Sequence, residues 1–234
     1  KLISESLDFE LTHAQKKVIK EIHLDLKNPI SMNRLLQGDV GSGKTIVSIL
    51  VSAIAVGNHV QFALMAPTEI LATQHYHTFN KEFNKANIPC ALLVGNMKKS
   101  DRTPILNGLK TGSIPVVIGT HALIQDDVQF KNLGLVIIDE QHRFGVNQRA
   151  VLLNKGTHPH FLAMTATPIP RTLSITYHGD MDLSIIDEMP ANRIPVVTKV
   201  VEPMRLGKVY KFIREEVAEG RQCMVIYPLV EESE

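Results

Sequence analysis

Residues 34–45 read "RLLQGDVGSGKT", in which a short apolar run leads into a glycine-rich loop. An apolar helical segment, Thr45 to Val56, follows at once. The pattern G-x-x-x-x-G-K-[ST] is matched by Gly38, Gly43, Lys44 and Thr45. Strand, loop and helix in this order are the context that a phosphate-binding P-loop requires, so a chance glycine-rich turn is the weaker interpretation.

The loop composition predicts how a nucleotide would be held. Glycines let the backbone wrap a phosphate, while backbone N–H groups and the helix N-terminus supply positive potential. We expect Lys44 to reach the β- and γ-phosphates and the Thr45 hydroxyl to bind Mg²⁺. The expected cofactor contacts in this loop are Gly38, Asp39, Val40, Gly41, Ser42, Gly43, Lys44 and Thr45.

A second stretch, "GLVIIDEQHRFG" (134–145), is an aliphatic run that ends in two adjacent carboxylates. Burying an unpaired carboxylate is costly, so a positive charge is expected beside it. A surface turn would also explain an Asp-Glu pair, but the P-loop favours a metal. We therefore expect Asp139 to hold Mg²⁺, directly or through water, and Glu140 to orient or deprotonate the attacking water.

Bulk composition narrows the class of protein. The 234 residues carry 25 Lys and Arg against 24 Asp and Glu, a formal net charge of +1, so any contact with nucleic acid must come from a local patch. Cys90 and Cys223 form no CxxC pair and are interpreted as reduced residues of a cytoplasmic protein. No apolar run reaches the length of a membrane span, and no signal peptide opens the chain.

Short apolar runs separated by helical patterns predict an α/β domain. Runs without polar alternation favour a mostly parallel sheet covered by helices on both faces, with ligands beyond the carboxyl ends of the strands. The expected strands are 34–37, 61–66, 90–94, 115–119, 135–139 and 160–166. The expected helices are 13–27, 45–56, 69–83 and 100–109, the first capped by Thr12.

The pattern restarts after about residue 193. "IPVVTKVV" (194–201) and "QCMVIYPLV" (222–230) are expected strands that flank an expected helix, 204–220. We therefore expect one α/β domain over 1–193 and the first βαβ unit of a second over 194–234. Because the chain opens on Lys1 and stops just after an expected strand, we expect it to be an excerpt of a longer protein.

Five strings occur in the order of motifs I, Ia, Ib, II and III of superfamily 2 helicases. They are "GDVGSGKT", "APTEILATQH", "GTHALI", "DEQH" and "TATPIPRT". The longer strings "VIIDEQHRFGVNQR" and "MDLSIIDEMPANR" resemble the RecG family of branched-DNA helicases in particular. The resemblance covers almost the whole chain. It implies a RecA-like P-loop NTPase lobe that uses ATP and Mg²⁺.

The resemblance also implies roles for further residues. Phe9, Thr12 and Gln15 match the family's adenine-recognition segment, and Gln141 and His142 match residues that link the γ-phosphate to motif III and DNA. Motif III itself corresponds to Thr165, Ala166 and Thr167. From residue type alone, Gln15 could equally be a solvated helix residue, and His142 a structural histidine.

DNA contacts are implied for motifs Ia and Ib. The matching residues are Pro67, Thr68, Gly119, Thr120 and His121. Backbone amides and hydroxyls at strand ends bind phosphates without reading bases, which suits a motor that moves along any sequence. Arg143, Arg149 and Arg171 could add positive potential or be ordinary surface residues. The paired histidines His75/His77 and His158/His160 have no neighbouring cysteine, which disfavours a zinc site.

The implied activity is an ATP-dependent DNA helicase that remodels forks and Holliday junctions in repair and recombination, in a cytoplasmic and monomeric parent protein. One alternative is the transcription-repair coupling translocase, which typically has a glutamate where this chain has Gln141. Another is a P-loop ATPase that does not act on DNA. Since no Gln-x-x-Gly-Arg-x-Gly-Arg string is present, we expect this stretch alone to bind Mg²⁺–nucleotide weakly and hydrolyse it slowly or not at all.

Overall fold

The computed structural model describes residues 9–167, 181–190 and 196–226. The chain divides into two compact units, residues 1–192 and residues 193–234, which are described separately. In the described parts of the chain, no helix is both long and apolar enough to cross a membrane.

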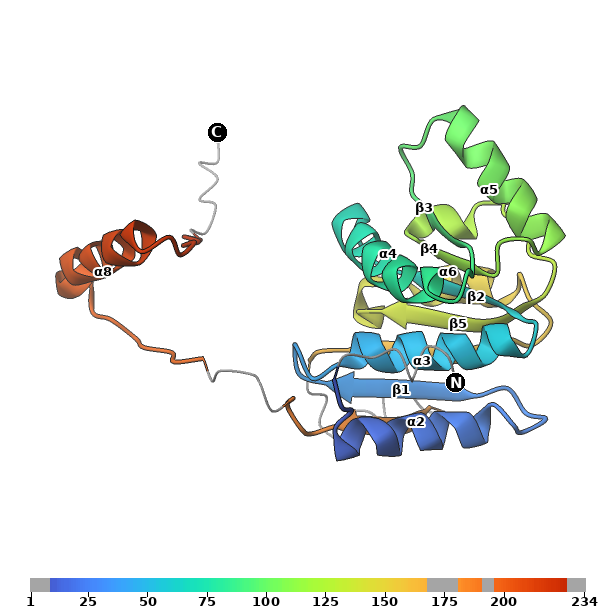
Figure 1. The fold of residues 1–234 in the computed structure, drawn as a ribbon, viewed down its shortest axis with the longest axis horizontal. Coiled ribbons are helices and arrows are strands. Elements are labelled where there is room, and N and C mark those ends of the chain that lie inside the picture. The colour runs from blue at the N-terminus through green and yellow to red at the C-terminus, as the bar shows by residue number, and fades with distance from the viewer. Residues whose placement is uncertain (1–8, 168–180, 191–195, 227–234) are drawn as a thin grey trace. The chain divides into compact units, whose positions relative to one another are not determined.

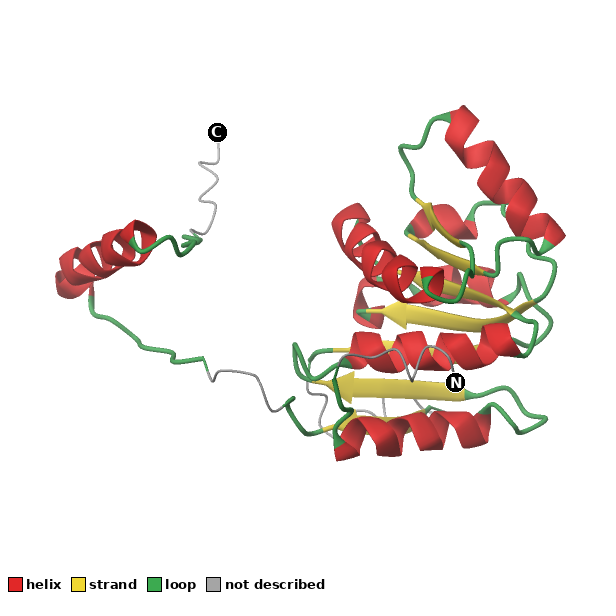
Figure 2. Ribbon diagram, viewed as in Figure 1, coloured by secondary structure: helices red, strands yellow, loops and turns green. Residues whose placement is uncertain are grey.

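The first unit is built on a sheet of seven strands that pair in parallel throughout (Figure 1, Figure 2). The strand order is β3-β4-β2-β5-β6-β1-β7. The strands are β1 (Asn33–Gly38), β2 (Gln61–Met65), β3 (Cys90–Leu93), β4 (Val116–Gly119), β5 (Leu133–Asp139), β6 (His160–Thr165) and β7 (Asp182–Ile186). The α/β class and the parallel sheet predicted from the sequence are confirmed.

Helices cover both faces of this sheet, and each face has its own hydrophobic core. One core takes residues from α2 (His13–Asp25), α3 (Lys44–Gly57) and α4 (Glu69–Asn84). The other takes Leu109 of α5 and Leu152 of α6. Successive residues of a strand alternate between the two cores because their side chains point to opposite faces. The bounds of α5 and α6 are Lys99–Thr111 and Val146–Leu153.

The N-terminus of α2 begins where the sequence predicts it. Thr12 accepts a hydrogen bond from the Gln15 backbone at 3.2 Å, and the Gln15 side chain accepts one from the Thr12 backbone at 3.0 Å. This reciprocal capping box satisfies two helix donors. The carboxylate of Glu188 accepts a further bond from Ala14 N at 3.0 Å, so a residue far along the chain also stabilises this helix end.

Strand β7 was not predicted. It is an edge strand that alternates exposed and buried residues, and it joins the sheet by pairing with β1. Arg34 of β1 fixes the junction. Its guanidinium donates to Asp25 of α2 at 2.6 Å and to the Ser184 hydroxyl of β7 at 3.0 Å, while Ser184 in turn donates to Glu21 at 2.5 Å. A buried arginine on a central strand therefore ties α2 and β7 together.

In the second unit the described residues form η3 (Pro203–Arg205) and α8 (Leu206–Ala218), as the helical pattern predicts. The expected strands 194–201 and 222–230 are wrong over residues 196–201 and 222–226, which adopt no regular structure. The rest of those two segments lies outside the described residues. A strand needs a neighbour to satisfy its backbone donors, and apolar sequence alone does not supply one.

Candidate nucleotide and DNA site

The P-loop connects β1 to α3 at the carboxyl edge of the sheet. Gly41 and Gly43 adopt positive φ angles of 81° and 95°, which side chains other than glycine rarely adopt. The Lys44 ammonium donates to the carbonyl oxygens of Gly38 at 2.6 Å and Asp39 at 3.1 Å. The lysine thus lies folded against its own loop, at the start of α3.

Gln15 connects α2 to this loop. Its side-chain amide donates to the Ser42 carbonyl at 2.7 Å, and Gln15 is almost fully buried. A Cβ on Gly43 would come within 2.2 Å of the Gln15 Nε2 atom, so the close approach requires glycine. Thr12 and Gln15 therefore lie at the nucleotide loop, as the resemblance implies. Phe9, the third residue of that segment, has a mostly exposed side chain.

The two acidic residues lie at the same edge as the P-loop. In the sheet order, β6 is the one strand between β5, which ends in Asp139, and β1, which enters the loop. Burial lowers the pKa of Lys44, and the charges of Asp139, Glu140 and Asp39 act in the opposite direction. Three carboxylates are therefore close enough to influence the lysine, and the two motifs converge on one place.

The Asp139 carboxylate is held by two hydrogen bonds. One oxygen accepts from the Glu140 backbone N–H at 3.0 Å, and the other lies 2.8 Å from His75 Nε2. His75 comes from α4 and was not predicted to be a site residue. The contact joins residues 64 positions apart, so no local pattern could have revealed it.

Glu140 has a left-handed backbone with φ of 49°. This conformation is strained for a residue with a side chain, and such strain clusters at functional sites. Its Oε2 atom is buried and has no hydrogen-bond partner in the described residues. The half-exposed imidazole of His142 lies beside it, with Nδ1 3.5 Å from this oxygen.

Residues of the predicted coupling segment follow β6, between the two motifs. The hydroxyl groups of Thr165 and Thr167 lie 2.8 Å apart, and Thr167 N donates to Thr165 Oγ1 at 3.2 Å. Ala166 lies between them. The buried Gln141 accepts a hydrogen bond from Arg149 of α6 at 3.3 Å, a contact that the sequence did not predict.

The residues present fit a magnesium nucleotide. Ser42 Oγ is buried in the loop without a hydrogen-bond partner in the described part of the chain, as is Glu140 Oε2. A partly buried lysine, an orphaned loop hydroxyl and a cluster of carboxylates match the donors and acceptors that a triphosphate and its metal require. Thr45 and Asp139, the predicted Mg²⁺ ligands, would each offer side-chain oxygen, which is the ligand atom that Mg²⁺ prefers.

The residues predicted to contact DNA follow β2 and β4, which are adjacent strands. Pro67 and Thr68 lead into α4, and the Thr68 hydroxyl accepts from Leu71 N at 3.3 Å. Position 119 requires glycine, because a Cβ atom there would lie 2.1 Å from the Leu93 carbonyl oxygen. Thr120 Oγ1 is buried without a hydrogen-bond partner among the described residues, and the next residue, His121, is exposed.

These residues share the carboxyl edge with the nucleotide residues but lie on the other half of the sheet. Arg143 and Arg149 both lie in the segment after β5, where Arg149 bonds to Gln141. Arg171 lies outside the described residues.

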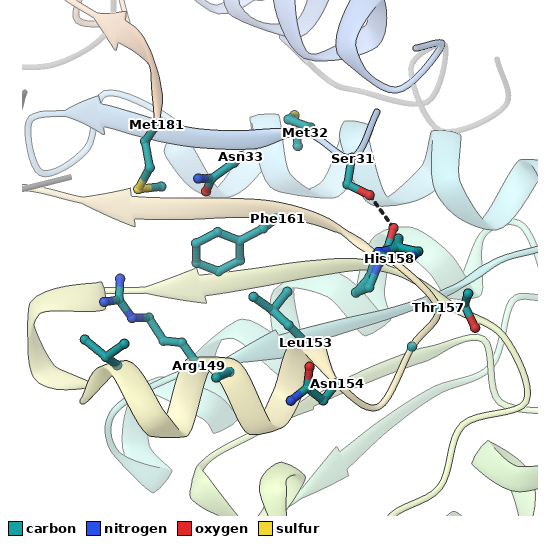
Figure 3. Close-up of a pocket in the computed structure, with 14 residues that line it drawn as sticks. Ser31, Met32, Asn33, Arg149, Leu153, Asn154, Thr157, His158, Phe161 and Met181 are labelled. Atoms are coloured by element: carbon teal, nitrogen blue, oxygen red, sulfur yellow. Dashed lines mark hydrogen bonds between the residues drawn. The ribbon is translucent and has the colours of Figure 1, made fainter. Parts of the chain in front are cut away.

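A separate cavity of about 950 Å³ lies between α6 and the beginnings of β1 and β6 (Figure 3). Ser31 donates to the His158 carbonyl at 2.6 Å at one end of it. Its lining includes Arg149, Phe161 and Met181 but none of the predicted nucleotide or DNA residues. This cavity is therefore separate from the P-loop.

A parallel sheet with a P-loop and an acidic strand end converging on its carboxyl edge defines an NTPase lobe of the RecA-like type. The chain belongs to the DEAD/DEAH box helicase family, whose model matches residues 12–175. Within that family it is similar to the ATP-dependent DNA helicase RecG. It is 54% identical to RecG of Synechocystis sp. over 99% of this chain and 52% identical to RecG of Bacillus subtilis over 98%.

Solved structures agree with these sequence relatives. A structure of RecG bound to a three-way DNA junction has a TM-score of 0.86 and 50% identity, covering 97% of this chain and 31% of that one. The UvsW helicase of bacteriophage T4 shares the fold alone, with a TM-score of 0.57 and 19% identity over 76% of this chain and 60% of that one. The chain spans 28% and 34% of the Synechocystis and Bacillus relatives, about a third of their length.

Proposed function

We propose that this chain is the ATP-binding motor lobe of an ATP-dependent DNA helicase that remodels branched DNA, such as forks and Holliday junctions, during repair and recombination. The observation that carries the proposal is the convergence of Lys44 with Asp139 and Glu140 at one sheet edge. The similarity to RecG along almost the whole chain supports DNA as the partner.

In this proposal each residue at the sheet edge has a defined role. Lys44 would exchange its bonds to the Gly38 and Asp39 carbonyls for the β- and γ-phosphate oxygens of ATP. Thr45 and Asp139 would hold Mg²⁺, which neutralises phosphate charge when it is bound. Glu140, whose buried Oε2 atom accepts no hydrogen bond from the described residues, would accept the proton of the attacking water.

The remaining residues would recognise the base and respond to hydrolysis. Gln15 lies against the loop and would contact adenine from the first turn of α2. Gln141 and His142 would pass the state of the γ-phosphate to Thr165, Ala166 and Thr167, which lie between the two motifs. The DNA backbone would lie on the β2–β4 half of the edge, contacting Pro67, Thr68, Gly119, Thr120 and His121.

In this proposal residues 1–193 form the first RecA-like lobe, and residues 194–234 begin a second. We further propose that the intact protein acts as a monomer in the bacterial cytoplasm and nucleoid. The curated relatives compared above are bacterial helicases.

ATPase activity of the intact protein, with and without forked DNA, tests the function. Forked DNA should stimulate turnover, and Lys44→Ala should abolish it while the circular dichroism spectrum stays unchanged, because the lysine contacts phosphate rather than the core. Lys17→Ala, an exposed lysine on α2, is the matched control and should retain turnover.

Hydrolysis that ignores DNA would contradict the helicase assignment and favour a P-loop ATPase with another substrate. Binding of RNA polymerase by the intact protein would instead favour the transcription-repair coupling translocase.

A further inference from the structure

His75 of α4 makes a direct contact with the proposed metal ligand. Its Nε2 atom lies 2.8 Å from Asp139 Oδ2, and the two side chains are only 11% and 13% exposed. An ionised carboxylate has no proton to donate, so the imidazole Nε2–H is the donor in this hydrogen bond. The bond is short and largely shielded from water.

The imidazole ring is fixed by aromatic packing. It meets the ring of Phe79 edge-on, with ring centres 6.5 Å apart and planes at 81°. Phe79 stacks on Phe62 of β2 at 5.7 Å and on Phe83 at 6.1 Å, and all three phenylalanines are fully buried. The His75 ring therefore lies between the Asp139 carboxylate and the aromatic core formed by α4 and β2.

The second oxygen of Asp139 accepts from the backbone N–H of Glu140 at 3.0 Å. Donors on both oxygens fix the plane of the carboxylate. Each oxygen can accept more than one hydrogen bond, so both keep a lone pair for a further ligand. The charge of Asp139 raises the pKa of Lys44, so the P-loop lysine lies near this carboxylate.

We propose that His75 is a positioning residue for the magnesium–nucleotide site. By holding the Asp139 carboxylate in one orientation, it prepares the metal ligand before the metal arrives. This inference rests on the proposed function, since it requires Asp139 to bind Mg²⁺. Partners that orient metal ligands are worth about 10–100-fold in metal affinity.

The test measures binding rather than turnover. Equilibrium fluorescence of an ATP analogue, titrated with Mg²⁺, would be compared for the intact protein and its variants. His75→Phe keeps an aromatic ring against Phe79 but removes the donor, and it should raise the Mg²⁺ concentration for half-maximal binding about tenfold or more. His75→Gln places an amide donor at a similar reach and should restore most of the affinity.

His77→Phe is the matched control, because His77 is exposed on the same helix and should leave the Mg²⁺ titration unchanged. Nucleotide binding in EDTA should be the same for all four proteins. Should His75→Phe fail to fold, His75→Leu gives the same comparison with His75→Gln.

Equal weakening by His75→Phe and His75→Gln would overturn the inference, because the donor would then be irrelevant. A wild-type titration in the Phe variant would do the same while leaving the proposed function intact. If the intact wild-type protein itself shows no Mg²⁺-dependent binding, the proposed function of the site fails and the inference falls with it.

Discussion

His160 begins β6 and is a half-buried titratable residue on the opposite edge of the sheet from the P-loop. Its Nδ1 atom accepts a hydrogen bond from Met32 N at 3.0 Å, which requires that nitrogen to be unprotonated. Burial lowers the pKa of the ring, and the charge of Asp25 acts against this shift. The folded state therefore favours the neutral imidazole.

This preference predicts a pH dependence of stability. Below the unfolded-state pKa of about 6.5, the unfolded chain binds a proton more readily than the folded one, so the contribution of His160 declines as pH falls toward the folded pKa. Above about pH 6.5 it is fully present. Urea unfolding between pH 8 and pH 5 should show a steeper loss for the wild type than for His160→Asn, whose amide oxygen can accept the same bond without titrating. Parallel pH profiles would contradict this assignment.

Glu140 shows at the same scale what a sequence can and cannot reveal. The pair of acids after an aliphatic run, taken together with the P-loop, predicts a site at a strand end, and Asp139 is the last residue of β5. The left-handed backbone of Glu140 and the contact of Asp139 with His75 were not predictable, because both depend on tertiary packing. Capping of α2 by Glu188 depends in the same way on residues 174 positions apart.

At the scale of elements, the junction of β1, α2 and β7 depends on Arg34, whose side chain is only 10% exposed. Arg34→Met should lower the free energy of unfolding by about 3 kcal/mol, because removing one member of a buried ion pair leaves the other charges uncompensated. The comparison is Arg102→Met. Arg102 pairs with Asp127, whose side chain is half exposed, so its loss should cost about 1 kcal/mol or less.

Urea denaturation of both variants measures the difference. Equal losses of stability would show that Arg34 contributes no more than a surface ion pair.

The six predicted strands all form, with ends shifted by at most two residues, because each is a short, mostly apolar run that lies largely buried in the sheet. Strand β7 escaped prediction because its buried residue Ser184 is polar while the neighbouring apolar Ile185 is exposed, so no continuous apolar run marks it. The opposite error occurred after residue 193, where apolar sequence was taken as strand although the described residues 196–201 and 222–226 form none. An apolar run predicts that a segment is buried, whereas a strand also requires a neighbouring strand with which its backbone can pair.

At the scale of the whole first unit, the strand order separates two predicted sites along one edge. The predicted nucleotide residues follow β1, β5 and β6, and the predicted DNA residues follow β2 and β4. His121→Ala should weaken DNA binding by the intact protein by a similar factor for every sequence, because the proposed contacts are to phosphates rather than bases. Fluorescence anisotropy with forked DNAs of different sequence checks this. A loss confined to one sequence would indicate base recognition instead.

Glu188 connects the segment after β7 to the N-terminus of α2 through a hydrogen bond. This acid lies just beyond β7, on the segment that continues toward residues 193–234, and its carboxylate bonds to the first turn of α2. That same turn carries Gln15, which touches the loop that would hold ATP. Residues that are 174 positions apart in the sequence therefore share one anchor point, and losing the Glu188 carboxylate would remove a hydrogen bond from the same helix turn that contacts the P-loop.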